Sequence, residues 1–232
     1  MDSRRHHQNK RRLGKDFWGP PIWCTIHILA ITLKKGNSKE YKEFLWLLTK
    51  LLPCDYCKGN LIKKLEEYPP EKYLSSNQKA FWYSYIIHDL ANQHITLHNP
   101  KTPKYSPTFE EVKNLYIKSL KYNRDEFIGH AVWTTIHVLA ATLRSENAQE
   151  YKRFLELLTV LLPDESYRKS LSNFLIENPI GPYLRNNHDA FFYSFILHMT
   201  INESIGKHSP SYDSVKKFYF SSLGEECDDC KV

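Results

Sequence analysis

The chain has 232 residues, of which 41% are hydrophobic and 14% aromatic, so length and composition exclude a peptide scaffold and predict a packed globular core. No apolar run approaches the roughly 18 residues that a membrane-spanning helix requires, so an integral membrane protein is not expected. The formal net charge of +6 comes largely from residues 1–15, so the charge of the whole chain does not point to a nucleic-acid partner.

Residues 1–15 form a basic, polar segment with no apolar stretch behind it. A secretory signal requires such a stretch, so we predict a solvated, disordered tail. A nuclear or nucleic-acid-binding tail is the alternative that the basic residues leave open.

The segments after the tail are predicted to be helical, because apolar residues recur at helical spacing and no stretch alternates. Pro20 and Pro21 favour a helix start that leads into residues 22–33. A second helix is expected over residues 39–52, where apolar side chains share one side, and Pro53 interrupts it.

Three further helices complete the pattern. The third is expected from about Cys54 to residue 67, and Asn77 can cap a fourth. Residues 108–111 (TFEE) form a capping-box pattern that opens a short fifth helix. Four helices and a short fifth predict an all-α bundle that buries a ligand or a partner between its ends.

The chain carries an internal repeat with an offset of 110 residues, since residues 23–30 (WCTIHILA) reappear as residues 133–140 (WTTIHVLA). Further matches at this offset are residues 51–53 with 161–163, His88 with His198, and Asn92 with Asn202. The register then slips by seven, so that Lys104 falls on Lys207. We therefore predict two tandem copies of one domain.

The two predicted domains, residues 16–120 and residues 126–223, differ at one decisive place. The first has the motif Cys54-Asp55-Tyr56-Cys57, and the second has Asp164-Glu165-Ser166-Tyr167. The second copy is therefore expected to be a degenerate pseudo-domain.

Four of the five cysteines form two CxxC pairs, Cys54/Cys57 and Cys227/Cys230, a pattern typical of redox or metal chemistry. A helix start after Pro53 offers unpaired N–H groups and the positive end of the helix dipole, which stabilise a thiolate. No metal is expected, although a zinc site made from both pairs is the alternative. Cys24 has no partner at this spacing and is expected to be a small buried apolar residue.

Aromatic and imidazole side chains recur at helical spacing near the first pair. Trp23 and His27 lie four residues apart and share a helix face, as do His88 and Asn92. Flat aromatics and hydrogen-bonding imidazoles beside a CxxC suit a stacked cofactor with a polar edge. Core packing with satisfied histidines is the alternative interpretation of each residue taken alone.

Together these motifs resemble the Erv/ALR family of FAD-dependent sulfhydryl oxidases over the whole first copy. The resemblance rests on Gly19-x3-Trp23-x3-His27, Lys50-x2-Pro53-Cys54-x2-Cys57, His88-x3-Asn92, and Lys104 before Ser106-Pro107. It implies an FAD in the mouth of a four-helix bundle, with the Cys54/Cys57 disulfide against the isoalloxazine ring. The residues implied to bind the cofactor are Gly19, Trp23, His27, Lys50, Tyr85, His88, Asn92, Lys104 and Tyr105. Among them, Lys50 would place a cation where reduction builds negative charge.

The resemblance also implies an electron path. Family members often carry a second, mobile cysteine pair, and Cys227/Cys230 on the acidic tail of residues 224–232 looks like that shuttle. Electrons would pass from substrate thiols to Cys227/Cys230, to Cys54/Cys57, to FAD and to molecular oxygen, which becomes hydrogen peroxide. By family analogy, Cys57 is nearer the flavin and Cys54 receives the exchange.

The tail is short, because the four residues from about Leu223 to Cys227 reach at most about 14 Å. Either the second copy packs so that its last helix ends near Cys54, or the tail serves another subunit. Many family members are homodimers whose shuttle acts across the subunits. We therefore predict that the tandem four-helix bundles pack as a pseudo-dimer, with a further homodimer left open.

The chain departs from the family pattern at three places. His88 is followed by Asp89 where the family has asparagine, no cysteines exist for the structural disulfide of cellular members, and Lys50 becomes Val160 in the second copy. FAD binding is not expected in the second copy, although five of its matching residues persist: Trp133, His137, His198, Asn202 and Lys207.

The sequence thus predicts a flavin-linked thiol oxidase that resembles the versions carried by large cytoplasmic DNA viruses. Its expected partners are thiol-containing protein substrates or a thioredoxin-like dithiol carrier, without a membrane or nucleic acid. The expected location is the cytoplasm, in a viral factory or virion, with the mitochondrial intermembrane space as the alternative. Two other functions stay open: a helical interaction protein whose CxxC pairs are structural or bind zinc, and a dithiol carrier without flavin.

Overall fold

The computed structural model describes residues 14–98, 100–101 and 103–223, and this part of the chain contains ten α-helices and no strand. The first half comprises α1 (Lys15–Ile31), α2 (Ser38–Leu51), α3 (Asp55–Glu67), α4 (Asn77–His98) and α5 (Phe109–Tyr122). The second half comprises α6 (Arg124–Ala141), α7 (Ala148–Leu161), α8 (Glu165–Glu177), α9 (Asn187–Ser204) and α10 (Tyr212–Leu223). Short 3-10 turns lie at Pro70–Lys72, Ser145–Asn147 and Gly181–Tyr183. The predicted all-α fold is confirmed.

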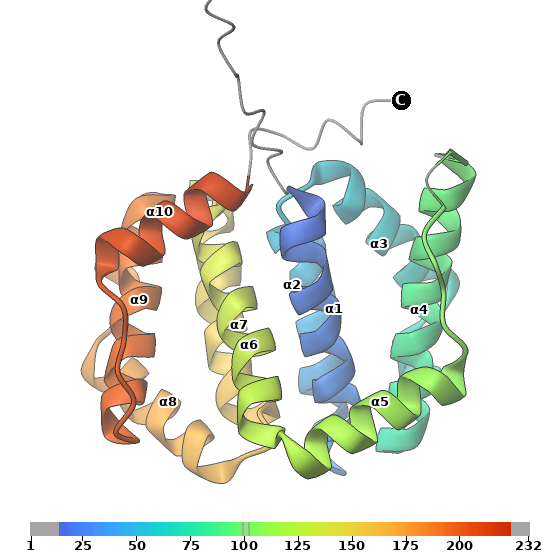
Figure 1. The fold of residues 1–232 in the computed structure, drawn as a ribbon, viewed down its shortest axis with the longest axis horizontal. Helices are drawn as coiled ribbons and strands as arrows, with labels where there is room; N and C mark the ends of the chain where they lie inside the picture. The colour runs from blue at the N-terminus through green and yellow to red at the C-terminus, as the bar shows by residue number, and fades with distance from the viewer. Residues whose placement is uncertain (1–13, 99, 102, 224–232) are drawn as a thin grey trace, which may run out of the picture.

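Four helices form the middle of the molecule, where α1 packs against α6 and α2 against α7 (Figure 1). On the outer sides, α4 covers α1 and α9 covers α6, while α3 packs on α2 and α8 on α7. Helix α5 crosses from α4 to α6, and α10 crosses from α9 to α1. Each fifth helix therefore contacts the first helix of the opposite half.

The buried part of the contact between the halves is mainly apolar and includes one pair of polar side chains. Helix α2 buries Tyr41, Phe44, Leu45 and Leu48, spaced so that they share one face. The rings of Phe44 and Phe154 meet across the contact with their centroids 6.0 Å apart. Thr25 and Thr135 place their Oγ1 atoms 2.9 Å apart between α1 and α6. Burial of each large apolar side chain contributes about 1.5–3 kcal/mol, so this face holds the halves together.

Helix α1 begins five residues before Pro20, so the predicted start of the first helix was wrong. Both prolines lie inside the helix and leave the carbonyls of residues 16 and 17 without their helical N–H donors. Trp18 and Ile22, buried on either side of the prolines, compensate by packing into the core. Helix α6 has no proline and begins one position earlier in the repeat, which shows that packing rather than proline sets the start.

The fourth helix begins at Asn77, whose Oδ1 accepts the Gln78 N–H at 3.0 Å, but the residue before it caps the next free N–H. The Oγ of Ser76 accepts a hydrogen bond from the Lys79 N–H at 3.3 Å, so Ser76 caps this end. Asn77 donates its Nδ2 to the carbonyl of Ile31 at 2.9 Å and ties α4 to the end of α1.

The capping box at the fifth helix is confirmed. The Thr108 hydroxyl accepts the Glu111 N–H at 3.4 Å, and the Glu111 carboxylate accepts the Thr108 N–H at 2.7 Å. The helix is not short, however, because α5 has 14 residues, as many as α2. Val112, Tyr116 and Leu120 continue an apolar face that the starting motif could not reveal.

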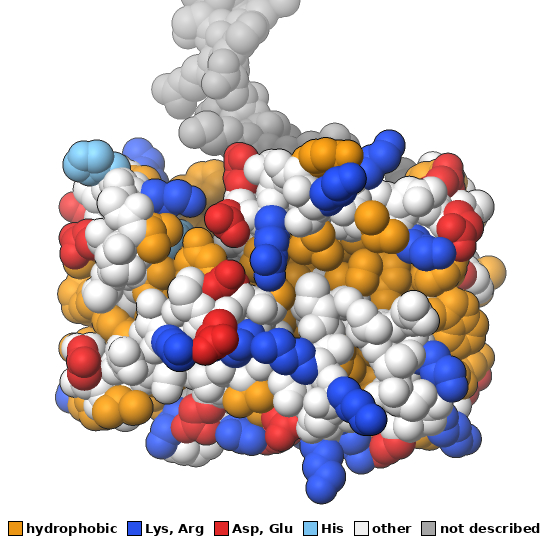
Figure 2. Space-filling model, turned by 90° about the horizontal axis from the view of Figure 1, so that it is seen from below, with side chains coloured by type: hydrophobic (Ala, Val, Ile, Leu, Met, Phe, Trp, Pro, Cys, Tyr) orange, Lys and Arg blue, Asp and Glu red, His pale blue; other side chains and the backbone are white. Residues whose placement is uncertain are grey.

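No helix within the described ranges is long and apolar enough to cross a membrane. Figure 2 shows one face of the molecule, on which lysine and arginine side chains are interspersed with acidic and apolar ones. On this face the mixture of charges creates no broad field of one sign.

Candidate functional site

The first CxxC pair lies at the turn between α2 and α3. Leu52 is extended, as expected for a residue before proline, and Pro53 then directs the chain into α3. Cys54 is the N-cap of α3, and its Sγ accepts a hydrogen bond from the Cys57 N–H at 3.2 Å. An N–H donor and the positive end of a helix both stabilise a sulfur that carries negative charge. The predicted helix-start position of the pair is confirmed.

A cavity of about 320 Å³ opens beside this turn. It is lined by the first part of α1, the end of α2, one face of α3, the second half of α4 and residues 104–107. Cys57 lines the cavity, whereas Cys54 is 4% exposed and lies in the core behind it. Of the two cysteines, Cys57 alone lines the cavity.

One wall of the cavity is a flat aromatic stack. Trp23 of α1 and His88 of α4 are stacked, with ring centroids 4.2 Å apart and an angle of 6° between their planes. Both line the cavity, whereas His27 is fully enclosed behind them. Such a wall suits a planar ligand, because offset stacking brings large apolar faces together.

A chain of hydrogen bonds fixes the orientation of His88. The Ser84 hydroxyl donates to the Phe81 carbonyl at 2.7 Å, so His27 donates its Nδ1–H to Ser84 at 2.8 Å. The Nε2 of neutral His27 then accepts the Nδ1–H of His88 at 3.0 Å. The remaining nitrogen of His88, Nε2, is left as a hydrogen-bond acceptor.

Burial keeps both imidazoles neutral. It lowers the pKa of His88 to about 4, a shift that the carboxylate of Asp89 partly opposes. Burial also holds the pKa of His27 well below its usual value, and His88 lowers it further. The stack therefore adds no positive charge to the cavity at neutral pH.

The positive charge of the cavity comes from lysines at its rim. Lys15, Lys64 and Lys104 line it together with one acidic residue, Asp16. The Nζ of Lys104 lies 2.8 Å from the Asp16 carboxylate. Tyr56, from within the CxxC motif, shares a hydrogen bond of 2.5 Å with the Nε2 of His94 and joins α3 to α4 at this edge.

The structure brings together most of the side chains that the sequence selected. Those in the cavity wall are Gly19, Trp23, Cys57, His88, Asn92, Lys104 and Tyr105. Asn92 donates to the Ser106 hydroxyl at 3.3 Å, and this bond positions the segment that carries Lys104 and Tyr105. Cys227 and Cys230 lie outside the described residues, as do residues 1–13 of the basic tail.

Three of the predicted cofactor residues do not line this cavity. His27 supports His88 from behind, and Tyr85 donates its hydroxyl to the Pro107 carbonyl at 3.1 Å on the far side of the segment. Lys50 is exposed at the contact between the halves, where its carbonyl accepts from Asn147 at 3.1 Å.

Sequence reasoning missed six polar residues of the cavity: Lys15, Asp16, Tyr56, Asn60, Lys64 and His94. Tyr56, Asn60 and Lys64 recur every four residues, so the helical spacing from the CxxC motif could have found them. Lys15 had been assigned to the tail but is the first residue of α1.

Cys24 is half-buried on α1 and makes a hydrogen bond with Tyr116 of α5. Burial raises the pKa of its thiol to about 11, so it stays protonated at neutral pH. Within the described residues, no group of three or more histidine, cysteine and acidic side chains is arranged to hold a metal ion.

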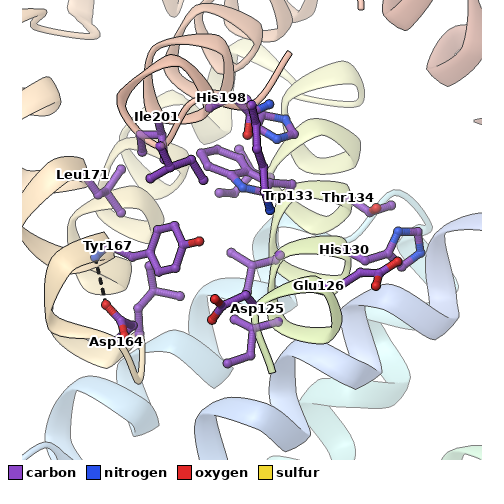
Figure 3. Close-up of a pocket in the computed structure, with 18 of the residues that line it drawn as sticks. Asp125, Glu126, His130, Trp133, Thr134, Asp164, Tyr167, Leu171, His198 and Ile201 are labelled. Atoms are coloured by element: carbon purple, nitrogen blue, oxygen red, sulfur yellow. Dashed lines mark hydrogen bonds between the residues drawn. The ribbon is translucent and has the colours of Figure 1, made fainter. Parts of the chain in front are cut away.

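The second half contains a matching cavity of about 330 Å³ (Figure 3). Trp133 and His198 repeat the aromatic stack, with ring centroids 4.0 Å apart and an angle of 7° between the planes. Asp164 and Tyr167 occupy the positions of the two cysteines. The cavity therefore keeps the aromatic wall of the first without its redox sulfur.

The second half also contacts the CxxC motif directly. Arg144, from the loop after α6, places its guanidinium 2.8 Å from the carboxylate of Asp55, which lies between the two cysteines. Lys58 contacts the same carboxylate at 3.0 Å. These two cations hold the pKa of Asp55 below its usual value, so the residue beside the sulfur atoms stays ionised.

Comparison with known proteins gives one family and two viral relatives. Residues 20–112 match the Erv1 / Alr family, so the predicted resemblance is confirmed. Two proteins named FAD-linked sulfhydryl oxidase, from a tick isolate and a warthog isolate of African swine fever virus, are each 26% identical over 127 residues. The match covers 51% of this chain and 98% of each relative. No solved structure gives a significant match.

Proposed function

Residues 20–112 match the Erv1 / Alr family, and on this premise we propose that the chain is an FAD-dependent sulfhydryl oxidase. It forms disulfide bonds in protein substrates and reduces oxygen to hydrogen peroxide. The observation that carries the proposal is that Cys57 lines the same cavity as the stacked Trp23 and His88. A redox-capable sulfur and a flat aromatic wall thus face one space.

The residues of the first cavity fit FAD. The Trp23 and His88 stack offers a face to a planar ring, and the Nε2 of His88 offers an acceptor to a ring N–H. Lys15, Lys64 and Lys104 suit the two phosphates, because charge-assisted hydrogen bonds to phosphate oxygens are strong. When bound there, FAD would supply a two-electron acceptor that can pass its electrons to oxygen.

The cysteine pair performs the thiol chemistry. A thiolate attacks the sulfur of Cys54, which breaks the bond to Cys57 and forms a mixed disulfide. A second thiolate from the same donor then displaces Cys54, so the donor gains a disulfide and the pair gains two electrons and two protons. Cys57 is the member that faces the cavity and passes the electrons on.

The burial of Cys54 favours a relay over direct contact with substrate. Because Cys54 is only 4% exposed, the surface of a folded substrate does not easily reach its sulfur. Helix α10 ends beside the start of α1, where the Gly14 N–H donates to the Ser222 carbonyl at 3.0 Å. Lys15 and Asp16, the next residues, line the first cavity. This arrangement supports a role for Cys227/Cys230 as the shuttle to Cys54.

We assign the chemistry to a domain of residues 16–120 and a supporting role to a degenerate domain of residues 126–223. The packing of α1 on α6 and α2 on α7 supports a pseudo-dimer within one chain. The Arg144 contact to Asp55 gives the second domain a direct influence on the motif that carries the sulfur. The African swine fever virus relatives support a viral-type enzyme that acts on thiols. We propose the cytoplasm of an infected cell as its location.

The experiment is an absorbance spectrum of the purified protein from 300 to 600 nm, followed by oxygen uptake with a dithiol. We expect one flavin per chain and oxygen consumption that disappears in Cys57→Ser, while the flavin band remains. Cys24→Ser is the matched control and should retain turnover, because its thiol lies outside the cavity wall.

Two other results would indicate a different function. A colourless protein with stoichiometric zinc would indicate the helical interaction protein. Exchange of disulfides without oxygen uptake would indicate a dithiol carrier.

A further inference from the structure

The cavity of the second half is a formed ligand site whose chemistry differs from that of the first. Its aromatic wall is intact, since Trp133 and His198 stack as Trp23 and His88 do. Leu171 and Tyr167 of α8 lie across the space from this wall, and Ile201 lies beside it (Figure 3). A volume of about 330 Å³ with mainly apolar walls is typical of a small-molecule site.

The hydrogen bonds behind the stack make His198 an acceptor. The Ser194 hydroxyl donates to the Phe191 carbonyl at 2.7 Å, and His137 therefore donates its Nδ1–H to Ser194 at 2.9 Å. The Nε2 of His137 accepts the Nδ1–H of His198 at 2.9 Å. Burial lowers the pKa of His198 to about 4, so its Nε2 carries a lone pair rather than a proton. A ligand of this cavity needs an N–H or O–H donor at that position.

The charges of the two cavities are opposite. In the first, three lysines outnumber one acidic residue, Asp16. In the second, Asp125, Glu126 and Asp164 outnumber one lysine, Lys207. The repeat relates several of these positions, since Lys15 becomes Asp125 and Lys64 becomes Phe174. The net negative charge of the second cavity therefore repels phosphate groups, whereas the net positive charge of the first attracts them.

Two of these carboxylates lie at the cavity beside Tyr167. Asp125 on α6 and Asp164 before α8 approach the ring of Tyr167 from two sides (Figure 3). Burial raises the pKa of the Tyr167 hydroxyl, and the charges of Asp125 and Asp164 raise it further. One oxygen of Asp164 caps α8 by accepting the N–H groups of Ser166 and Tyr167. The carboxylates add further acceptors for a ligand that carries amino groups.

We propose that this second cavity binds a planar, amino-substituted nitrogen heterocycle without phosphate groups, of the aminopurine class. The ring lies in the plane of His198 and overlaps the edge of the Trp133 indole, its amino group donates to the Nε2 of His198, and the carboxylates repel nucleotides and dinucleotides. The assignment is independent of the oxidase chemistry proposed for the first cavity, because it requires neither FAD nor a cysteine.

The test is isothermal titration calorimetry of the whole chain, as purified, with adenosine and with ADP as probes. We expect one adenosine site per chain and binding of ADP at least about tenfold weaker, the size expected from repulsion by a few nearby charges. Trp133→Leu should abolish adenosine binding, whereas the matched variant Trp23→Leu should retain it.

A second variant keeps the proposal testable if Trp133→Leu does not fold. Asp125 is exposed, so Asp125→Lys leaves the core intact and restores the charge found at this position in the first half. It should reduce the preference for adenosine over ADP by about tenfold. The proposal is overturned if adenosine does not bind at millimolar concentration, if ADP binds more tightly, or if Trp23→Leu rather than Trp133→Leu removes the site. Recovery of two flavins per chain would also overturn it.

Discussion

The buried pair of threonines between the halves predicts an asymmetric response to two similar substitutions. Thr135 donates its hydroxyl to the Ala131 carbonyl at 2.9 Å, so the single bond between the threonines must run from Thr25 to Thr135. Thr135→Val leaves the Thr25 hydroxyl, which is fully buried, without its acceptor and should cost about 1–3 kcal/mol. Thr25→Val removes only an incoming bond, since Thr135 keeps its own, and should cost about 0.5–1 kcal/mol.

The assay is urea unfolding at pH 7 of the two single variants and the double variant. Valine preserves the shape of threonine, so the differences report on the hydroxyl groups rather than on a cavity. In the double variant no unpaired hydroxyl remains, and its free energy of unfolding should exceed that of Thr135→Val alone. The reasoning is refuted if Thr25→Val costs as much as Thr135→Val, or if the two costs simply add.

Three further predictions concern the histidines, the contact between the halves and the charge beside the CxxC motif. Burial lowers the pKa values of His88 and His198 to about 4, so below pH 6.5 the unfolded chain binds more protons than the folded chain. The free energy of unfolding should therefore fall by up to about 2 kcal/mol per histidine between pH 6.5 and 5. Urea unfolding at a series of pH values measures this fall, and a free energy that does not change with pH would contradict it. Phe154→Ala empties a fully buried position and should cost about 3–5 kcal/mol in urea unfolding, whereas Leu115→Ala on an exposed site should cost under about 0.5 kcal/mol. Arg144→Ala removes a half-exposed ion pair and should change stability by less than about 1 kcal/mol, with an effect that 1 M salt abolishes; a larger loss that salt does not change would indicate a packing role.

The sequence could predict what depends on local spacing. The CxxC pair at a helix start and the capping box at Thr108 follow from short motifs whose geometry a helix fixes, whereas the stack of Trp23 on His88 joins α1 to α4 and does not. The repeat further indicated that Trp23, His27 and His88 of the first half have counterparts in the second, although the CxxC pair does not.

What depends on the approach of distant helices could not be predicted. His27 lies behind the cavity wall because α4 brings Ser84 against it from 57 residues away. Arg144 meets Asp55 of the CxxC motif across 89 residues, and Arg144 itself belongs to no motif. The start of the first helix was predicted wrongly from Pro20 and Pro21. The burial of Trp18 and Ile22, which only the folded core determines, outweighs the preference of proline for the first turn of a helix.

The meeting of α10 with α1 has a consequence for the order of the two halves. Ser222 accepts a hydrogen bond from Gly14, so the gap between the end of the second half and the start of the first is small. On the other side, a single residue, Asn123, joins α5 to α6. A circular permutant that starts at Arg124 and continues through a short linker into α1 would therefore preserve every packed helix. The packing of the helices therefore does not depend on which half comes first along the chain.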